Sequence, residues 1–379
     1  MTNNESIASS VAEADEIRVA RLERDILNLN AQLAKKDGCI QLQRNIIEQQ
    51  LDELKHKQRL SEEMLVFFYF FRPLIFPLMW LVRPLYKALR PRLGVLEQYP
   101  PQPLRLPSKF KGDLPLGAAP KISIVTPSFN QSVFLERTLE SVFEQHYPNL
   151  EYYVQDGGST DGTMDVLRHY ESQLTGWVSA PDNGQSNAIN IGFSKTSGEI
   201  MAWLNSDDIL LPGTLAFVAD FFSRHPDVDV IYGHRILIDQ EGMEIGRWML
   251  PHHDHNILSW ADFIPQETMF WRRCIWEKAG GKIDESLNFA IDWDLLLRFR
   301  DAGAHFSRVD RFLGGFRIHP TQKTSAEKST GFQEMSQIRE RTLGRLPSKK
   351  EITRAVYPYL LKHVLIDVGW RIRSKLGLT

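Results

Sequence analysis

The chain has 379 residues, 42% of them hydrophobic, and a formal net charge of −2. This length suits one enzyme domain with extensions, and the near-neutral charge gives no global basic field, so we expect no nucleic-acid partner. The two cysteines, Cys39 and Cys274, lie far apart without metal-ligand spacing and indicate neither a disulfide framework nor a zinc site. This cysteine usage favours a reducing cytoplasm, and the N-terminus lacks a basic segment followed by an apolar core, so no secretory signal is expected.

A seven-residue repeat runs through residues 16–63, after a short stretch, 1–15, that we expect to be a disordered tail. Its first apolar line consists of Val19, Ile26, Leu33, Ile40, Ile47 and Leu54. The second line begins at Leu22 and Leu29 and becomes polar at Lys36, Gln43 and Gln50. The repeat predicts a coiled coil, and its β-branched residues favour a parallel homodimer. The alternative is a single amphipathic helix lying on the enzyme domain.

The next zone, residues 64–93, is intensely apolar and aromatic but is interrupted by Arg72-Pro73, Pro77 and Arg83-Pro84. A spanning helix needs about 20 apolar residues, and an arginine in mid-membrane costs roughly 2.5–3.5 kcal/mol. We therefore predict a segment that re-enters the membrane or lies at its interface, with a spanning helix or burial against protein as alternatives. Basic residues follow it, so the enzyme is expected on the cytoplasmic face of the membrane. Residues 94–120 read as a proline-rich linker.

Strand and helix patterns alternate in the predicted enzyme domain, residues 121–328. The predicted strands cover 122–126, 151–155, 177–179, 200–204 and 228–232, and the predicted helices cover 134–143, 164–170, 187–194 and 215–224. This order predicts an α/β fold with a mostly parallel sheet and helices on both faces, and ligands then bind beyond the carboxyl ends of the strands. The remaining residues, 329–379, have a helical, basic and amphipathic pattern. They are expected either to lie on anionic lipid or to pack on the enzyme.

Polar residues stand where the predicted strands end. Thr126-Pro127-Ser128-Phe129 follows the first strand, and a tight turn with an aromatic residue suits the floor of a base-binding pocket, although an ordinary loop has the same pattern. The second strand ends at Asp156, whose carboxylate can accept hydrogen bonds from a base or a ribose. A plain glycine-rich turn explains the GGSTDGT that follows, but it does not explain Asp156.

Asp207 and Asp208 come directly after the apolar strand that covers 200–204. Two adjacent carboxylates are costly together unless a cation or hydrogen-bond donors neutralise them, and Mg²⁺ typically takes one or two carboxylates plus phosphate oxygens. A solvated loop is the alternative. His319 is a candidate further metal ligand, and Arg317 or Lys323 is a candidate phosphate contact.

Asp292 and Asp294 open a later apolar helix pattern. Acidic residues are stabilised in the first turn of a helix by its dipole, which explains them without any catalytic role. The functional interpretation is a general base, because an acceptor hydroxyl must lose its proton as it attacks an anomeric carbon. The two side chains point to different sides of the helix start, so at most one is expected to face a donor.

Seven blocks occur in an order that resembles the family 2 glycosyltransferases over residues 121–325. They are ISIVTPSFNQ, YYVQDGGSTDGT, SAPDNGQSNAINIGF, GEIMAWLNSDD, IPQETMFWRR, FAIDWDLLLRF and FRIHPTQKT. The resemblance implies a GT-A fold, a nucleotide-diphosphate sugar donor and usually an inverting displacement. One departure is Ile291, where many members carry Glu, so the usual acidic pair is shifted to Asp292 and Asp294.

The resemblance also implies roles for individual residues. Asp156 is expected to contact the nucleobase, usually uracil. Asp208 is expected to bind the metal, and Asp207 to contact the ribose or the metal. Asp292 is expected to be the general base that takes the acceptor proton. The donor side is further expected to include Thr126, Pro127, Phe129 and Asn187, while Gln266 and Glu267 resemble positions on the acceptor side.

Together these features predict a glycosyltransferase that moves a sugar from a nucleotide-diphosphate donor, a UDP-sugar by expectation, to a hydroxyl group. The cofactor is expected to be Mn²⁺ or Mg²⁺. The membrane-directed segments favour a lipid-linked or polysaccharide acceptor. The alternative is a coiled-coil membrane scaffold whose transferase-like domain is inactive.

The heptad pattern leads to a prediction about assembly. A peptide spanning residues 14–63 should be helical and dimeric, with helicity that rises with concentration, because a lone helix cannot hide its continuous apolar line. The polar residues Lys36, Gln43 and Gln50 should keep the pairing modest. Analytical ultracentrifugation and circular dichroism measure both properties. A peptide that stays monomeric at high micromolar concentration would instead indicate a docking helix for another protein.

Overall fold

The structure is a computed structural model that describes residues 89–107, 119–320, 322 and 328–378. The predicted coiled coil and residues 64–88 of the apolar segment lie outside this part of the chain, and so do residues 108–118 of the predicted linker. Among the described residues, no helix combines the length and apolar character needed to cross a membrane.

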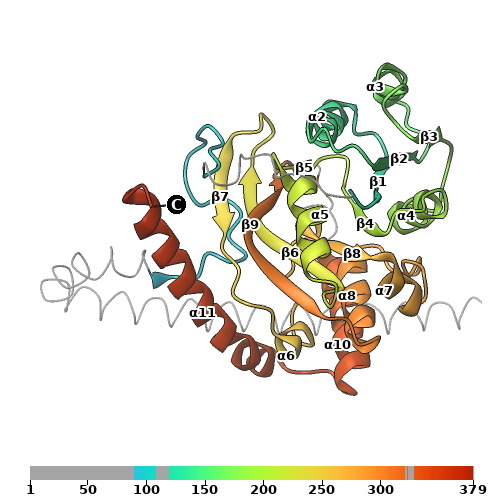
Figure 1. Cartoon of the computed structure of the whole chain (residues 1–379). Helices are drawn as coiled ribbons and strands as arrows, with labels where there is room; N and C mark the ends of the chain where they lie inside the picture. Colours follow the sequence, from blue (N-terminus) through green and yellow to red (C-terminus); the bar gives the residue numbers. More distant parts are fainter. Residues whose placement is uncertain (1–88, 108–118, 321, 323–327, 379) are drawn as a thin grey trace, which may run out of the picture. The chain divides into compact units, whose positions relative to one another are not determined.

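One nine-stranded sheet organises the described residues (Figure 1). Its first half is parallel, in the order β3-β2-β1-β4. Beyond β4 lies β8, antiparallel to both β4 and β6, and then β6, β9 and β5, with β7 paired to β6. The strands are β1 (Ile122–Ser128), β2 (Leu150–Asp156), β3 (Gly176–Ser179), β4 (Ile200–Trp203), β5 (Ile209–Leu210), β6 (Val230–Ile238), β7 (Glu244–Trp248), β8 (Phe270–Arg272) and β9 (Phe306–Arg317). Since β6 and β9 run parallel to each other and in the direction of β1–β4, six of these nine strands share one direction, which fits a mostly parallel sheet.

Helices cover both faces of this sheet, as predicted. Strand residues alternate between two cores: Ile200 and Ala202 of β4 pack with helices of one face, and Met201 and Trp203 pack with helices of the other. The first face carries α2 (Ser132–Phe143), α3 (Thr163–Tyr170) and α5 (Thr214–Arg224), and the second carries α4 (Gln185–Ser194), α7 (Arg273–Lys278) and α8 (Ile291–Asp301). The α/β class predicted from the alternating pattern is therefore confirmed.

The shorter connections and the C-terminal region complete the fold. Two short helices, α6 (His255–Leu258) and the 3₁₀ helix η2 (Gln266–Thr268), lie between β7 and β8. The chain ends with α10 (Lys328–Leu343) and α11 (Lys349–Lys375), and Ile338 of α10 and Tyr359 of α11 belong to the core beside α8. A capping box starts α11, in which the Glu351 amide donates to the Ser348 hydroxyl at 3.3 Å and the Ser348 amide donates to the Glu351 carboxylate at 2.8 Å.

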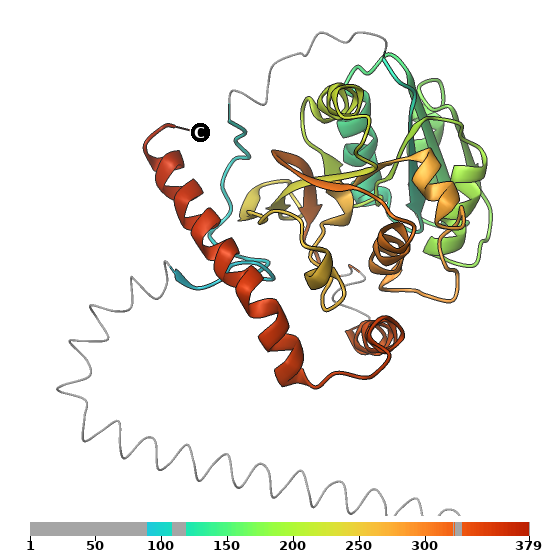
Figure 2. The same ribbon diagram turned by 60° about the horizontal axis from the view of Figure 1, so that its bottom comes forward.

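α11 packs on the enzyme through one face and exposes another (Figure 2). The packed face includes His363, whose Nδ1 donates to the Met249 carbonyl at 2.6 Å, so that its Nε2 accepts the amides of Arg92 and Leu93 at 3.1 Å each. Exposed leucine and isoleucine side chains on this helix and at its C-cap are Leu361, Leu365, Ile372 and Leu376. One of the two alternatives predicted for this region, a helix packed on the enzyme, is therefore observed. The helix also keeps an apolar stripe that the enzyme body does not cover.

The predicted linker is also attached to the body over part of its length. The Gln98 amide donates to the Ile245 carbonyl at 2.9 Å, and Gln102 pairs with Glu244 in an antiparallel bridge. The exposed backbone of β7 is thereby partly covered, which removes an open sheet edge. Proline-rich sequence does not reveal such attachment, because its backbone partners lie about 140 residues further along the chain.

Candidate active site

A cavity of about 850 Å³ opens at the carboxyl ends of β1 and β4, where the parallel topology favours ligand binding. Seven of the residues singled out from the sequence line it: Pro127, Phe129, Asp207, Asp208, Gln266, Glu267 and Asp292. The cavity lining does not include the candidates Thr126, Asp156, Asn187, Asp294, Arg317 and His319, and Lys323 lies outside the described residues. The fold therefore gathers donor-side, metal-side and acceptor-side candidates into one cavity.

Asp156 lies buried behind the cavity wall at the end of β2. Its carboxylate accepts the Ser159 amide at 2.9 Å and the Ser159 and Ser179 hydroxyls at 2.5 Å each. These bonds hold the turn that carries Gly157. A Cβ atom at Gly157 would lie 3.2 Å from Asp182 Oδ1 and 3.3 Å from the Phe129 ring, so glycine keeps this stretch of wall open.

Two further donor-side candidates have partners within the protein. The buried Thr126 hydroxyl shares a 2.9 Å hydrogen bond with the Tyr152 hydroxyl. The Asn187 amide group donates to Glu285 at 3.1 Å and accepts the Asn183 amide at 3.2 Å. In this structure both side chains hold the surroundings of the cavity in shape.

The two adjacent aspartates differ in their surroundings. Asp208 is 1% exposed, and its carboxylate accepts the Arg317 amide at 3.0 Å. Burial, and then the charges of Asp207 and Glu267, raise the pKa of Asp208 well above its ordinary value. Asp207 reaches the cavity and lies 3.0 Å from His319 Nε2. This is a concentration of negative charge that a cation would relieve.

The described residues include no group of three or more His, Cys, Asp and Glu side chains arranged to hold a metal by themselves. The donor set fits a metal shared with a phosphate ligand, because Mg²⁺ usually binds one or two carboxylates and completes its shell with phosphate oxygens and water. Asp208 and Asp207 supply those carboxylates, with the imidazole of His319 adjoining Asp207. These carboxylates could therefore bind a divalent metal only together with a ligand such as a diphosphate.

A buried ion pair stands beside these aspartates. Arg235 of β6 donates to Glu267 through Nε at 2.7 Å and through its terminal nitrogen at 2.5 Å. The guanidinium lies between the rings of Trp248 and Phe316, at 4.7 and 4.3 Å from their centres. Glu267, expected on the acceptor side, lines the cavity with its charge already matched by Arg235.

Asp292 and Asp294 have separate environments at the start of α8. Asp292 is half-buried and lines the cavity, and burial raises the pKa of its carboxyl to about 6 against the opposing hydrogen bond from the Trp293 amide. Asp294 is 1% exposed and forms ion pairs with Arg298, at 2.8 Å, and with Arg341 of α10. Asp294 therefore joins two helices, and Asp292 is the carboxylate presented to the cavity.

The start of α8 is fixed from α10. The buried carboxylate of Glu334 accepts the amides of Asn288, Phe289 and Ala290 at 2.8, 2.8 and 2.9 Å. These amides precede the first turn of the helix, where backbone donors lack helical partners and attract negative charge. Glu334 consequently sets where Asp292 enters the cavity, although it lies more than 40 residues later in the chain.

Sequence patterns did not indicate a site role for several residues that line the cavity: Gln185, Asn205, Arg235, Trp248, Asp262 and Phe316. Gln185 donates to Asn205 at 2.8 Å, Asn205 donates to Gln266 at 3.1 Å, and Gln266 donates to the Trp203 carbonyl at 2.7 Å. This chain of amides fixes the cavity floor. A charged residue inside the apolar run VIYGHRILI was the one available signal for Arg235, because a buried cation requires a partner.

With this geometry in hand, the comparisons with known proteins identify the family. The family model described as glycosyl transferase family 2 matches residues 123–292, from β1 to the start of α8. An uncharacterised glycosyltransferase of Mycobacterium tuberculosis is 30% identical over 185 residues, which cover 48% of this chain and 69% of that protein. The chain belongs to glycosyltransferase family 2. It is accordingly a glycosyltransferase, and its core is the GT-A-like α/β architecture that the sequence predicts.

Other relatives of this family 2 glycosyltransferase share shorter parts of their length or lower identity. Chondroitin synthase of Escherichia coli is 28% identical over 242 residues, covering 62% of this chain and 34% of that protein. O-antigen biosynthesis protein RfbC of Myxococcus xanthus is 26% identical over 235 residues, covering 61% and 18%. The crystal structure of S. aureus TarS with UDP-GlcNAc superposes with a TM-score of 0.49 at 19% identity, over 64% of this chain and 72% of that one.

The two aspartates of α8 should respond oppositely to neutralisation. Asp294→Asn should lower the free energy of unfolding by about 1.5–3 kcal/mol, because it breaks charged hydrogen bonds to Arg298 and Arg341. Asp292→Asn should leave stability unchanged at pH 4 and raise it at pH 8. The pKa of Asp292 is higher in the folded than in the unfolded state, so ionisation above pH 6 costs stability that the amide avoids. Urea unfolding at both pH values measures this, and loss of stability in Asp292→Asn at pH 8 would contradict it.

Proposed function

We propose that this glycosyltransferase moves a sugar from a UDP-sugar to a hydroxyl of a polysaccharide or lipid-linked acceptor, with a divalent metal and with inversion at the anomeric carbon. The observation that carries the proposal is the meeting of Asp207, Asp208 and Asp292 in one cavity of about 850 Å³. Such a volume suits a nucleotide sugar, and the aspartates separate into a pair for the diphosphate and a single carboxylate for the acceptor.

The donor end of the cavity supports a nucleotide. Pro127, Phe129 and Gly157 provide an apolar, closely approachable wall for a base, and the resemblance to family 2 favours uracil. Asp208 and Asp207 would hold Mn²⁺ or Mg²⁺, with His319 adjoining Asp207 as the further candidate ligand. When bound, the metal stabilises the negative charge that develops on the leaving diphosphate.

The acceptor end supports base catalysis by Asp292. The acceptor oxygen forms a bond to the anomeric carbon as the bond from that carbon to the diphosphate oxygen breaks, and Asp292 takes the hydroxyl proton. A pKa of about 6 suits this role, because the carboxylate is ionised at neutral pH and remains more basic than an ordinary aspartate. Gln266 and Glu267, held by Asn205 and Arg235, would border the acceptor.

The acceptor class and the location are part of the same proposal. Two relatives carry the names chondroitin synthase and O-antigen biosynthesis protein, which supports a polysaccharide or a lipid-linked saccharide. The apolar segment 64–93 and the exposed stripe of α11 support attachment to the cytoplasmic face of a membrane, and the heptads support a homo-oligomer. The alternative, an inactive scaffold, has no support from the cavity, which keeps all three proposed functional carboxylates.

Metal dependence tests the donor half of the proposal. UDP should bind more tightly with Mn²⁺ or Mg²⁺ than in EDTA, because Asp207 and Asp208 need the diphosphate to complete a metal shell. Asp208→Ala should abolish that difference, while Asp227→Ala, a change of the same charge at an exposed loop, should preserve it. Isothermal titration calorimetry measures these affinities. If wild-type UDP affinity were the same in EDTA as with Mn²⁺ or Mg²⁺, the metal assignment would be wrong.

The pH profile of transfer tests the acceptor half. Turnover should rise as the pH passes through about 6, where Asp292 loses its proton, and then level off. Asp292→Asn should lower turnover by roughly 10²–10⁴ and leave UDP affinity nearly intact, because the side chain acts on the acceptor proton. Turnover can be followed by mass spectrometry with a panel of nucleotide sugars. Wild-type turnover in Asp292→Asn would remove this residue from the catalytic step.

A further inference from the structure

One wall of the active-site cavity is built partly from residues outside the family match. Leu96, which precedes β1, lines the cavity together with Trp248 at the end of β7 and Phe316 near the end of β9. The family model covers residues 123–292, so Leu96 and Phe316 lie on either side of it in the sequence. Three separate parts of the chain therefore meet to form this apolar wall.

The position of Leu96 is fixed from both sides. The Trp248 indole donates through Nε1 to the Val95 carbonyl at 3.2 Å. The Gln98 side chain pairs with the backbone of Arg247, donating to its carbonyl at 2.9 Å and accepting its amide at 3.2 Å. Leu96 lies between these two attachments, so the fold itself holds this part of the predicted linker against the cavity.

The two aromatic rings of this wall are held by Arg235. The centres of the Trp248 and Phe316 rings lie 4.7 and 4.3 Å from its guanidinium carbon. Both side chains are half-buried and line the cavity, so part of each ring stays open to a ligand. Rings fixed on a cation form a rigid apolar surface, and the C–H face of a sugar ring packs well on such a surface.

Asp262 supplies hydrogen-bond acceptors at the same end of the cavity. It is exposed to the cavity, and its Oδ1 accepts the Ile264 amide at 3.4 Å. A carboxylate has about four acceptor positions, so it can also accept hydroxyl groups of a ligand. The surrounding protein, and then the charge of Asp292, raise the pKa of Asp262 well above its ordinary value, so the two carboxylates lie close enough to interact.

The charge of the cavity restricts which acceptor fits. The lining residues that the structure describes carry six carboxylates: Asp182, Asp207, Asp208, Asp262, Glu267 and Asp292. The one lysine or arginine among these described residues is Arg235, which is paired with Glu267. A diphosphate would bring its own metal, but an acidic acceptor would add an unbalanced anion beside Asp262 and Asp292. A neutral acceptor avoids that repulsion.

We propose that this end of the cavity binds the terminal ring of the acceptor as a neutral sugar, with its C–H face on the wall formed by Leu96, Trp248 and Phe316. Its hydroxyls donate to Asp262, and its reacting hydroxyl faces Asp292. This subsite rests on the transferase activity proposed above and narrows its acceptor. The acceptor end is a neutral saccharide, in contrast to a lipid alcohol, a lipid phosphate or a uronic acid.

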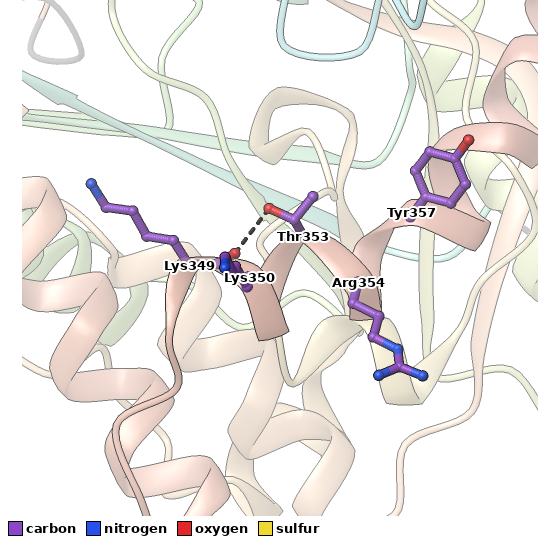
Figure 3. A pocket seen from close by; sticks show the side chains of 5 residues that line it. All are labelled: Lys349, Lys350, Thr353, Arg354 and Tyr357. Carbon is purple, nitrogen blue, oxygen red and sulfur yellow. Dashed lines mark hydrogen bonds between the residues drawn. The ribbon is translucent and has the colours of Figure 1, made fainter. Parts of the chain in front are cut away.

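A hollow on α11 offers a comparison within the same molecule. Lys349, Lys350, Thr353, Arg354 and Tyr357 line it, and the Thr353 hydroxyl donates to the Lys349 carbonyl at 2.9 Å (Figure 3). It also places an aromatic ring beside polar groups, but its five lining residues include three cations and no carboxylate. All five are exposed and come from neighbouring turns of one helix. Tyr357 is therefore a suitable control for loss of an aromatic side chain outside the proposed subsite.

The first experiment compares acceptors with the full chain, Mn²⁺ and a panel of UDP-sugars, by mass spectrometry. The acceptors are octyl glycosides of neutral hexoses, the matching octyl uronides, octyl phosphate and octanol. Transfer should occur to at least one neutral glycoside, with kcat/KM about tenfold or more above that of its uronide, because the uronide adds a carboxylate beside two others. Octanol and octyl phosphate, which lack the ring, should accept no sugar.

The second experiment tests the wall with the preferred glycoside. Leu96→Ala and Trp248→Leu should each raise the acceptor KM about tenfold and leave UDP affinity unchanged, because they remove apolar contact with the acceptor alone. Val95→Ala changes the neighbouring residue, which does not line the cavity, and should change KM less than about twofold, as should Tyr357→Ala. If thermal unfolding shows that Trp248→Leu destabilises the chain, Leu96→Ala against Val95→Ala decides the result.

Asp262→Asn tests the charge argument. It should reduce the preference for the neutral glycoside over its uronide about tenfold, because it removes a repelling charge, and a merely structural role would not change that preference. Equal use of the uronide by the wild type, or wild-type KM in Leu96→Ala, would overturn the subsite. UDP binding without transfer to any neutral glycoside would defeat the subsite alone, whereas failure to bind UDP with Mn²⁺ would defeat the proposed function and this subsite with it.

Discussion

The cavity depends on the balance between its carboxylates and the guanidinium group of Arg235. Asp208, Glu267 and Asp292 gather there, where burial raises the pKa of both Asp208 and Asp292 and the charge of Glu267 adds to each shift. Arg235 is held by two hydrogen bonds to Glu267 and by the rings of Trp248 and Phe316, so it offsets this charge from a fixed position. The carboxylates that Arg235 does not pair with include Asp207 and Asp208, where the proposed metal and diphosphate would meet.

The residues that match the family model depend on the chain that follows them. The match ends at residue 292, yet Arg317 of β9 donates its amide to Asp208, and Glu334 and Arg341 of α10 hold both ends of the first turn of α8. Gly314 lets β9 lie close to the backbone of Glu267, because a Cβ atom at this position would be 2.6 Å from the Glu267 carbonyl oxygen. The C-terminal region is thus structurally part of the active site, although no residue of α11 lines the cavity.

Sequence patterns predicted the regular half of the fold well and the ion-paired half poorly. The apolar runs of β1, β2 and β4 and the amphipathic helices between them were located within two residues, because burial on both faces leaves a clear apolar signal. β7 and β9 were not predicted, since they carry residues such as Arg247, Glu244 and Arg311 that resemble surface positions until their partners are known. The same limit applies to Asp156 and Asn187, whose hydrogen bonds to neighbouring loops are tertiary facts. Asp207, Asp208 and Asp292 could be singled out because they follow a buried strand or open a helix, and the structure places all three at the cavity.

His363 attaches the end of the predicted membrane segment, at Arg92 and Leu93, to the enzyme body. Because its imidazole holds the amides of Arg92 and Leu93 against the Met249 carbonyl, the chain is fixed to the enzyme body from Arg92 onwards. Only four residues lie between Lys87 and Arg92, so these two residues are at most about 17 Å apart, whereas a free linker of the length of residues 94–120 would reach about 90 Å. If residues 64–88 attach to a membrane, as proposed above, so short a connection would keep the active site within a thin layer above that membrane. Such confinement would favour elongation of acceptor chains that grow close to the membrane over capture of acceptors from solution.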